Sequence, residues 1–232
     1  MRIPLHLLCV AGGLMTLALA TTGLAAAAPA TGDVHVYQRV NGYNNETRGK
    51  LTYQVARVEG DRITVSVTPD NPEAGRQRTE VFTREGNWLA HEVENHGHKV
   101  HYEFAEAYPA FVFPLEQGKS WSIRVKATVP DEQRPRSVRV DGKVVGTERV
   151  RVPAGEFDTI KVKRTVYPGD HAFMLSETYV METDWYAPAL GRVVRTERDS
   201  RFLDLQSCAF ARCEARGDWD IYELVESRPA KR

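Results

Sequence analysis

The residues best suited to chemistry are four histidines that lie close together in the chain. Imidazole groups are common metal ligands, and His91 to His96 comes close to a zinc-protease helix motif. It holds one residue too many, which on a helix would rotate the second imidazole by about 100° away from the first. The stretch alternates instead like a hairpin with His96-Gly97 at its tip, which puts His91 and His101 on opposite faces. We expect no metal and no cofactor; a weak divalent site using His96 and His98 is the alternative.

Groups for nucleophilic or acid–base catalysis have no recognisable setting in this sequence. It has no G-x-S-x-G motif, and Ser120 and Ser122 flank Trp121 in an expected strand. Glu182 and Asp184 share one face of another strand, where we expect them to be solvated. We therefore assign no catalytic residue. A hydrolase whose site is assembled only in three dimensions remains an alternative, because triads are defined by geometry.

Two charged residues interrupt apolar faces of neighbouring strands. Arg164 lies in the series of Ile160, Val162 and Val166, and Glu177 lies within the apolar series that begins at Phe173. A four-residue loop at 168–171 would make Arg164 and Glu177 diagonal neighbours. They would form a structural ion pair or the polar end of an apolar ligand cavity. The expected cavity residues are Tyr102, Arg164, Leu175, Glu177, Tyr179 and Trp185.

The N-terminus has the pattern of an export signal. Arg2 precedes an apolar stretch, and the alanine-rich segment ending at Ala30 offers small-residue cleavage sites. We expect residues 1–30 to be removed and the mature protein to begin near Thr31 in the periplasm, with secretion as a second possibility. An uncleaved membrane anchor is the alternative, since no charged residue lies between Ile3 and Ala30. After cleavage we expect no membrane span.

Signal removal would leave two cysteines, Cys208 and Cys213. In an exported protein, an even pair at this spacing predicts a disulfide that closes a short loop. Such a loop would contribute only about 2 kcal/mol. The disulfide would stabilise this local loop and contribute little to the stability of the whole fold.

The charge balance argues against a nucleic-acid partner. The chain has 31 basic and 31 acidic residues, spread along its length without a basic stripe. Binding to phosphates requires clustered lysine and arginine.

Alternation of apolar residues predicts an all-β protein. Leu51, Tyr53 and Val55 share one face, which a three-residue turn at 59–61 would align with the face of Ile63, Val65 and Val67. In the hairpin with its tip at 96–97, Val93 should face Val100, His91 should face Tyr102, and Leu89 should face Phe104. Further strands are expected at 120–129, 137–152, 157–167, 173–186, 192–203 and 218–225. We predict one domain over residues 31–232: a large antiparallel sheet of about ten strands, strongly curved or closed into a barrel or half-barrel, with helix only in the signal peptide.

Three landmarks pair a turn with an aromatic anchor: Gly118 with Trp121, Pro153-Ala-Gly155 with Phe157, and Trp185-Tyr186 with Pro188 and Gly191. Through them residues 115–196 resemble the DUF3108-like family of exported bacterial β-proteins of unknown function. The resemblance implies a curved, exported β-sheet and carries no site with it. The combined expectation is a non-enzymatic envelope protein that binds or shields an apolar or amphipathic partner, such as a lipid-like molecule or another envelope protein. A structural or assembly component of the envelope is the other alternative.

Overall fold

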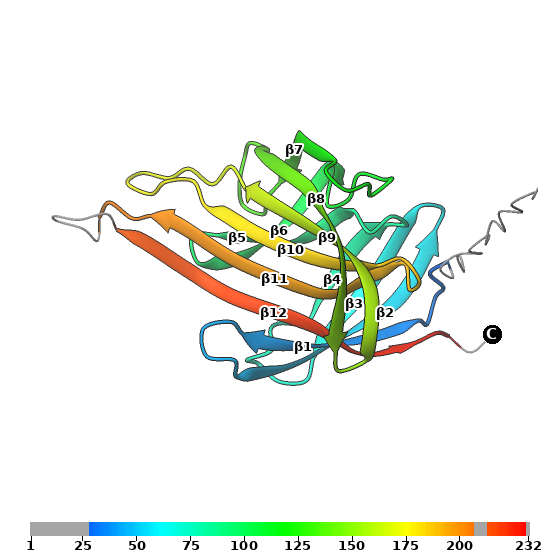
Figure 1. The fold of residues 1–232 in the computed structure, drawn as a ribbon. Coiled ribbons are helices and arrows are strands. Elements are labelled where there is room, and N and C mark those ends of the chain that lie inside the picture. Colours follow the sequence, from blue (N-terminus) through cyan, green and yellow to red (C-terminus); the bar gives the residue numbers. More distant parts are fainter. Residues whose placement is uncertain (1–27, 207–212, 231–232) are drawn as a thin grey trace, which may run out of the picture.

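The computed structural model describes residues 28–206 and 213–230, and its strands form one closed antiparallel barrel (Figure 1). The expected all-β, barrel-like sheet is therefore confirmed, with twelve strands where about ten were predicted. The strands are β1 (Val34–Asn41), β2 (Thr47–Glu59), β3 (Arg62–Pro69), β4 (Arg78–Thr83), β5 (Trp88–Asn95), β6 (His98–Tyr108), β7 (Ser120–Thr128), β8 (Arg136–Val152), β9 (Gly155–Tyr167), β10 (Tyr179–Ala187), β11 (Arg192–Leu203) and β12 (Glu214–Arg228).

Chain order and spatial order agree around the barrel. Each strand from β2 to β12 pairs with its neighbours in the sequence, and β1 closes the ring by pairing with both β2 and β12. Closure leaves no free sheet edge, so every strand has a hydrogen-bonding partner on both sides. Residues 28–33 and the end of β12 lie together at one end of the barrel, and the loop after β9 lies at the other (Figure 1).

The β2–β3 hairpin has the expected faces but a different turn. Val55 pairs with Val65 and Tyr53 with Val67, as a three-residue turn would require. The turn itself has two residues, because Glu59 pairs with Arg62, and a bulge at Ala56 restores the alignment. A bulge adds one residue to one strand and shifts its register by one. The apolar face is thus preserved by a feature that alternation alone does not predict.

The β5–β6 hairpin follows the expected register near its tip. Val93 pairs with Val100 and His91 with Tyr102. The register then shifts between Trp88 and Ala90, so Leu89 does not face Phe104 as expected.

The loop between β9 and β10 is longer than the four residues expected. β10 begins at Tyr179, and Phe173 lies in the loop with 86% of its surface exposed. Arg164 pairs with Glu182 across the two strands. The register that would place Arg164 beside Glu177 is wrong, because Pro168-Gly169-Asp170 begins a long loop where a tight turn was expected.

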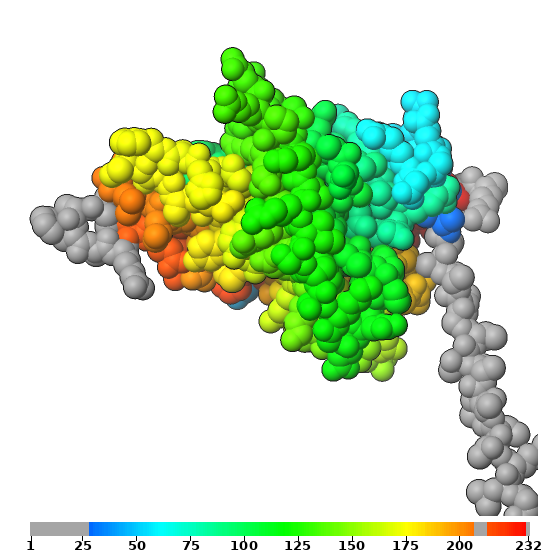
Figure 2. Space-filling view, turned by 90° about the horizontal axis from the view of Figure 1, so that it is seen from above, coloured from blue at the N-terminus to red at the C-terminus, as the bar shows by residue number. Residues whose placement is uncertain are grey.

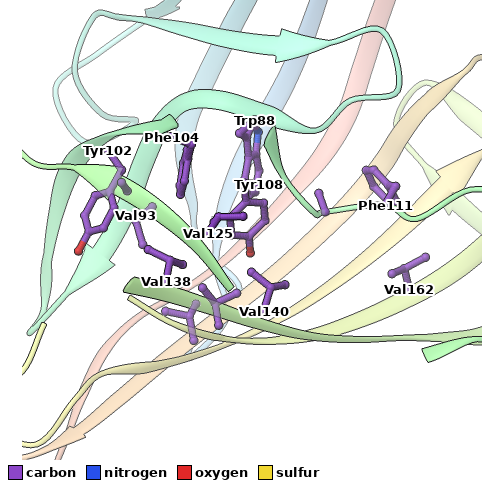
Figure 3. Packing of buried hydrophobic residues seen from close by; sticks show 14 of the residues in the cluster. Trp88, Val93, Tyr102, Phe104, Tyr108, Phe111, Val125, Val138, Val140 and Val162 are labelled. Atoms are coloured by element: carbon purple, nitrogen blue, oxygen red, sulfur yellow. The ribbon is translucent and has the colours of Figure 1, made fainter. Parts of the chain in front are cut away.

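The main apolar core fills the part of the barrel bounded by β5 to β10. Side chains from these strands and from the segment after β6 point toward one another, with Tyr102, Phe104 and Tyr108 beside valines of β7, β8 and β9 (Figure 3). Phe104 and Tyr108 have ring centroids 5.4 Å apart. From above, this half of the molecule is covered by the green and yellow segments of the chain (Figure 2).

The far end of the β8–β9 hairpin crosses β10, β11 and β12 (Figure 1). There the backbone nitrogen of Ala154 donates to the carbonyl of Leu224 at 2.9 Å. Phe157 and Trp185, two of the family landmarks, pack in the separate apolar cluster formed at this crossing. The landmark anchors thus join parts of the barrel.

In the described residues, the structure contains no helix long and apolar enough to cross a membrane. The predicted signal segment lies outside these residues up to position 27, and so does Cys208. The Cys208–Cys213 disulfide therefore stays a prediction.

Candidate functional site

A cavity of about 220 Å³ lies inside the barrel. Its walls come from β1 to β5 and from β10 to β12, which are consecutive strands around the ring, and from Ala110 and Phe111 in the segment after β6. The volume is many times the roughly 15 Å³ that a single water needs. The cavity extends to the end of the barrel that carries Pro29, the β4–β5 turn at Gly86 and the β10–β11 turn at Gly191, and we call this end its mouth.

The cavity wall is predominantly apolar and aromatic. Tyr37 and Tyr53 meet edge to face with ring centroids 5.4 Å apart, and Phe111 packs against Tyr186 at 5.5 Å. The apolar and aromatic members of the wall are Tyr37, Tyr53, Val55, Ile63, Val65, Phe82, Trp88, Ala110, Phe111, Tyr186, Val193 and Tyr222. Ligand sites are commonly built in this way, with a few placed polar groups among apolar side chains.

The first polar group on the wall is a buried triad of Arg78, Glu80 and His91. Arg78 Nε lies 2.6 Å from Glu80 Oε1, and His91 Nδ1 lies 3.2 Å from Glu80 Oε2. Burial lowers the pKa of His91, although the negative charge of Glu80 acts to raise it, so the imidazole is neutral at neutral pH. Burial opposes the charge of Glu80, yet its contacts with His91 and Arg78 lower its pKa to about 2. Because His91 is neutral, Arg78 is the cation that keeps Glu80 ionised.

Trp88, His91 and Arg198 form the inner end of the cavity. The Trp88 and His91 rings stack at 4.0 Å with an interplanar angle of 8°, and Arg198 lies over the Trp88 ring at 5.1 Å. The same three residues also line a smaller cavity of about 30 Å³ that reaches Glu94 and Asp220. They therefore lie between the larger space and the smaller one.

A second buried ion network adjoins the cavity wall and includes two of its residues, Asp184 and Arg198. Arg164 Nη2 lies 2.9 Å from Glu182 Oε2 and 2.6 Å from Asp184 Oδ2, and its Nη1 donates to the carbonyl of Ala110 at 3.0 Å. Arg198 Nε lies 3.0 Å from the other oxygen of Glu182. Asp184 reaches the cavity wall, while Arg164 does not. The expectation that Glu182 and Asp184 are solvated is wrong, because both are buried as partners of Arg164.

The mouth of the cavity carries His35, Tyr37 and Arg192. Tyr37 donates its hydroxyl hydrogen to the carbonyl of Val193 at 2.7 Å. His35 is buried, with Nδ1 2.9 Å from Ser227 Oγ and with no hydrogen-bond partner at Nε2. Burial, and secondly the charge of Arg192, lower the pKa of His35 to about 3.

None of the six residues predicted for the cavity lies on its wall, and of the six only Arg164 is ion-paired with a residue of the wall, Asp184. Arg164 forms this ion pair from behind the wall and does not itself border the cavity. Tyr102 is buried in the main core, where its hydroxyl bonds to Arg136 and to the carbonyl of Pro168. Trp185 lies on the opposite face of β10 from Asp184, in the cluster under the β8–β9 hairpin.

The other three predicted residues lie at the far end of the barrel. Leu175 forms an isolated bridge with Asp204, and Glu177 accepts a hydrogen bond from the backbone of Gly169 at 3.0 Å. The hydroxyl of Tyr179 donates to Glu214. The predicted contact between Arg164 and Glu177 is therefore wrong, since the long loop moves Glu177 away from the inner face of β10.

The histidines of the β5–β6 hairpin are separated, as the register predicted. His91 faces the interior, and His96 Nε2 lies 2.8 Å from the carbonyl of Ser176. Within residues 28–206 and 213–230, no group of three histidine, cysteine or acidic side chains is placed to hold a metal ion. The absence of a bound metal remains a prediction.

Fold and cavity together define a class: closed antiparallel barrels with an internal, partly apolar cavity. Residues 116–209 match the DUF3108-like family, so the resemblance drawn from residues 115–196 is confirmed over this part of the chain. No curated protein matches the sequence.

Three solved bacterial structures are among those of similar shape. A candidate lipoprotein from Parabacteroides distasonis is 16% identical, with a TM-score of 0.49 over 86% of this chain and 96% of that one. A candidate exported protein with a YmcC-like fold from Bacteroides fragilis is 14% identical, with a TM-score of 0.46 over 88% and 99%. The hypothetical lipoprotein YmcC from Escherichia coli is 12% identical, with a TM-score of 0.48 over 87% and 90%.

Proposed function

We propose that this protein is an exported component of the cell envelope that binds an apolar or amphipathic small molecule inside its barrel and does not transform it. The cavity carries this proposal. It is lined by eight consecutive strands, mainly through aromatic and aliphatic side chains, and extends to one end of the barrel. Barrels wider than the smallest ones do not fill with their own side chains and so leave room for a guest.

The polar groups around the cavity favour binding over catalysis. Glu80, Glu182 and Asp184 are already held by arginines, so they are not poised to exchange protons with a substrate. A hydroxyl–imidazole contact does exist at the mouth, between Ser227 and His35. A histidine with a pKa of about 3 is a weak base at neutral pH, where efficient general bases have pKa values near 7. The contact therefore does not favour a hydrolase.

The location follows from the export signal predicted at residues 1–30. Pro29 lies at the cavity mouth, within the segment that signal cleavage would remove. Cleavage near Thr31 would therefore open the entrance further. In the periplasm, such a cavity would suit the shielding of a lipid-like molecule from water, because burial of each methylene contributes about 0.8 kcal/mol.

The proposal is tested by titrating the mature protein with a fluorescent fatty-acid analogue. Val65→Phe adds bulk to the cavity wall and should weaken saturable binding by at least about tenfold, while thermal unfolding shows that the protein is folded. The matched control is Val145→Phe, because Val145 is 40% exposed and lies outside the cavity. Absence of saturable binding by the wild type, or equal loss in both variants, would refute a cavity ligand. The structural or assembly role would then replace it.

A further inference from the structure

The cavity mouth holds a guanidinium without a carboxylate partner. Among the arginines on the wall, Arg78 pairs with Glu80, Arg198 pairs with Glu182, and Arg84 Nε donates to the carbonyl of Gly60 at 2.8 Å. No carboxylate in the described part of the chain lies within 4.0 Å of a nitrogen of Arg192. Arg192 is half-buried, so its charge is only partly solvated. A cation in this position favours an anionic guest.

Asp33 and Asp184, the acidic residues whose charges act on His35 and Tyr37 beside Arg192, are committed elsewhere, while Glu85 on the β4–β5 turn is exposed to solvent. Asp33 accepts a hydrogen bond from the backbone nitrogen of Ala230 at 2.8 Å, which remains after removal of residues 1–30. Asp184 is held by Arg164 and accepts from the hydroxyl of Thr196 at 2.6 Å. These bonds satisfy the carboxylates without using the guanidinium of Arg192.

His35 supplies a second polar atom at the same place. Its Nδ1 contacts Ser227, while its buried Nε2 lacks a partner, and a buried polar atom without a partner is costly. The ring is neutral at neutral pH, so it adds no competing charge. When the Ser227 hydroxyl donates to Nδ1, the ring proton is on Nε2, which can then donate to a guest oxygen.

Resting on the cavity-binding function above, we infer that the ligand is an amphiphile with one small anionic head, a carboxylate or phosphate, bound by Arg192 and His35 at the mouth. Its apolar body lies inward between Tyr37, Tyr186 and Val65. Guanidinium binds carboxylate and phosphate through paired, charge-assisted hydrogen bonds, which are stronger than neutral ones. The hydroxyl of Tyr37 already donates to the Val193 carbonyl, so Tyr37 remains neutral and its ring borders the head group.

The test compares ligands that share a ten-carbon chain and differ only in the head: decanoate, decyl phosphate, decanol and decylamine. Each displaces a bound fluorescent dye from the mature protein at pH 7.5. The wild type should bind at least one of the two anions about tenfold or more tightly than decanol, and should bind decylamine least. Whichever anion binds more tightly identifies the head.

Arg192→Gln should abolish the preference for the anion while decanol binding stays within about twofold. Arg62→Gln is the matched control, since it removes the same charge from an exposed residue that pairs with Thr83 near this end of the barrel and is not on the cavity wall. It should leave the preference in place. Equal binding of anion and alcohol by the wild type, or equal effects of the two substitutions, would overturn the Arg192 assignment and leave the cavity ligand standing. Failure of all four ligands to displace the dye would overturn both.

Discussion

The guanidinium of Arg164 lies 2.6 Å from the carboxylate of Asp184, with both side chains buried inside the barrel. Although burial alone would lower the pKa of Arg164, Asp184 and Glu182 raise it. The pair joins β9 to β10 and fixes the acidic side chain that borders the cavity. It also leaves Asp184 unavailable to a cationic guest.

Removing the cation from this network should be strongly destabilising. Arg164→Met leaves Asp184 buried without its partner, and loss of one member of a buried pair costs about 3–5 kcal/mol. Urea unfolding measures the change. Arg151→Met breaks the exposed pair with Glu156 on the β8–β9 hairpin and serves as the control, with no measurable change expected. Equal stability of the two variants would contradict the account of the network.

The family landmark Trp121 requires a glycine opposite it. A Cβ atom on Gly142 would come within 2.1 Å of the Trp121 ring, and the indole nitrogen donates to the carbonyl of Pro109 at 3.1 Å. Gly142→Ala should therefore cost about 1–3 kcal/mol, as overpacking does. Adding Trp121→Ala should make the alanine at 142 almost neutral in a double-mutant cycle. Additive effects of the two substitutions would show that the ring and the glycine are not in contact.

Glu94 should make stability depend on pH. Burial raises the pKa of Glu94 to about 7; Lys99 opposes this, and Asp218 and Asp220 add to it. The folded state then holds the proton on Glu94 more tightly than the unfolded state does. The resulting contribution to the free energy of unfolding is present below pH 4.5 and is lost as the pH rises through 7.

Glu94→Gln keeps the neutral form and should be more stable than the wild type at pH 8, on the order of 1 kcal/mol. The advantage should shrink toward pH 5. Thermal unfolding across this range measures it, with Glu103→Gln, an exposed position on the same hairpin, as control. An advantage that does not change with pH would refute the raised pKa.

The predicted Cys208–Cys213 disulfide gives a direct chemical expectation. Mature protein unfolded without reductant should react with no equivalent of a thiol reagent, and with two after reduction. Two reactive thiols before reduction would show that the pair is reduced.

The sequence predicts local pairing well because alternation and turns are local signals. The β5–β6 register follows from the His96-Gly97 tip, and the β2–β3 faces survive because the bulge at Ala56 offsets the shorter turn. After Tyr167 the sequence favours a tight turn at Pro168, but the structure has a long loop there. This loop shifts the register of β10 by an odd number of residues, so the side chains expected to face the interior face outward and the reverse.

The candidate site was predicted poorly because it depends on closure. Arg164 was identified as a polar residue on an apolar face, but its partners required the correct register of β10. His35 and Arg192 are brought together by the pairing of β1 with β12 and of β12 with β11. These contacts join residues far apart in the chain, and no short sequence motif predicts them.

The central claim is that a guest occupies the cavity, and Trp88 offers a direct measurement. Of the four tryptophans, Trp88 lies on the cavity wall, whereas Trp121, Trp185 and Trp219 do not. A fatty acid brominated along its chain quenches tryptophan fluorescence on contact, and the unbrominated acid serves as control. The account predicts saturable quenching in the wild type that is largely lost in Trp88→Phe, while dye displacement shows that this variant still binds the acid. Binding with no quenching, or quenching unchanged in Trp88→Phe, would place the ligand outside the barrel and contradict the account.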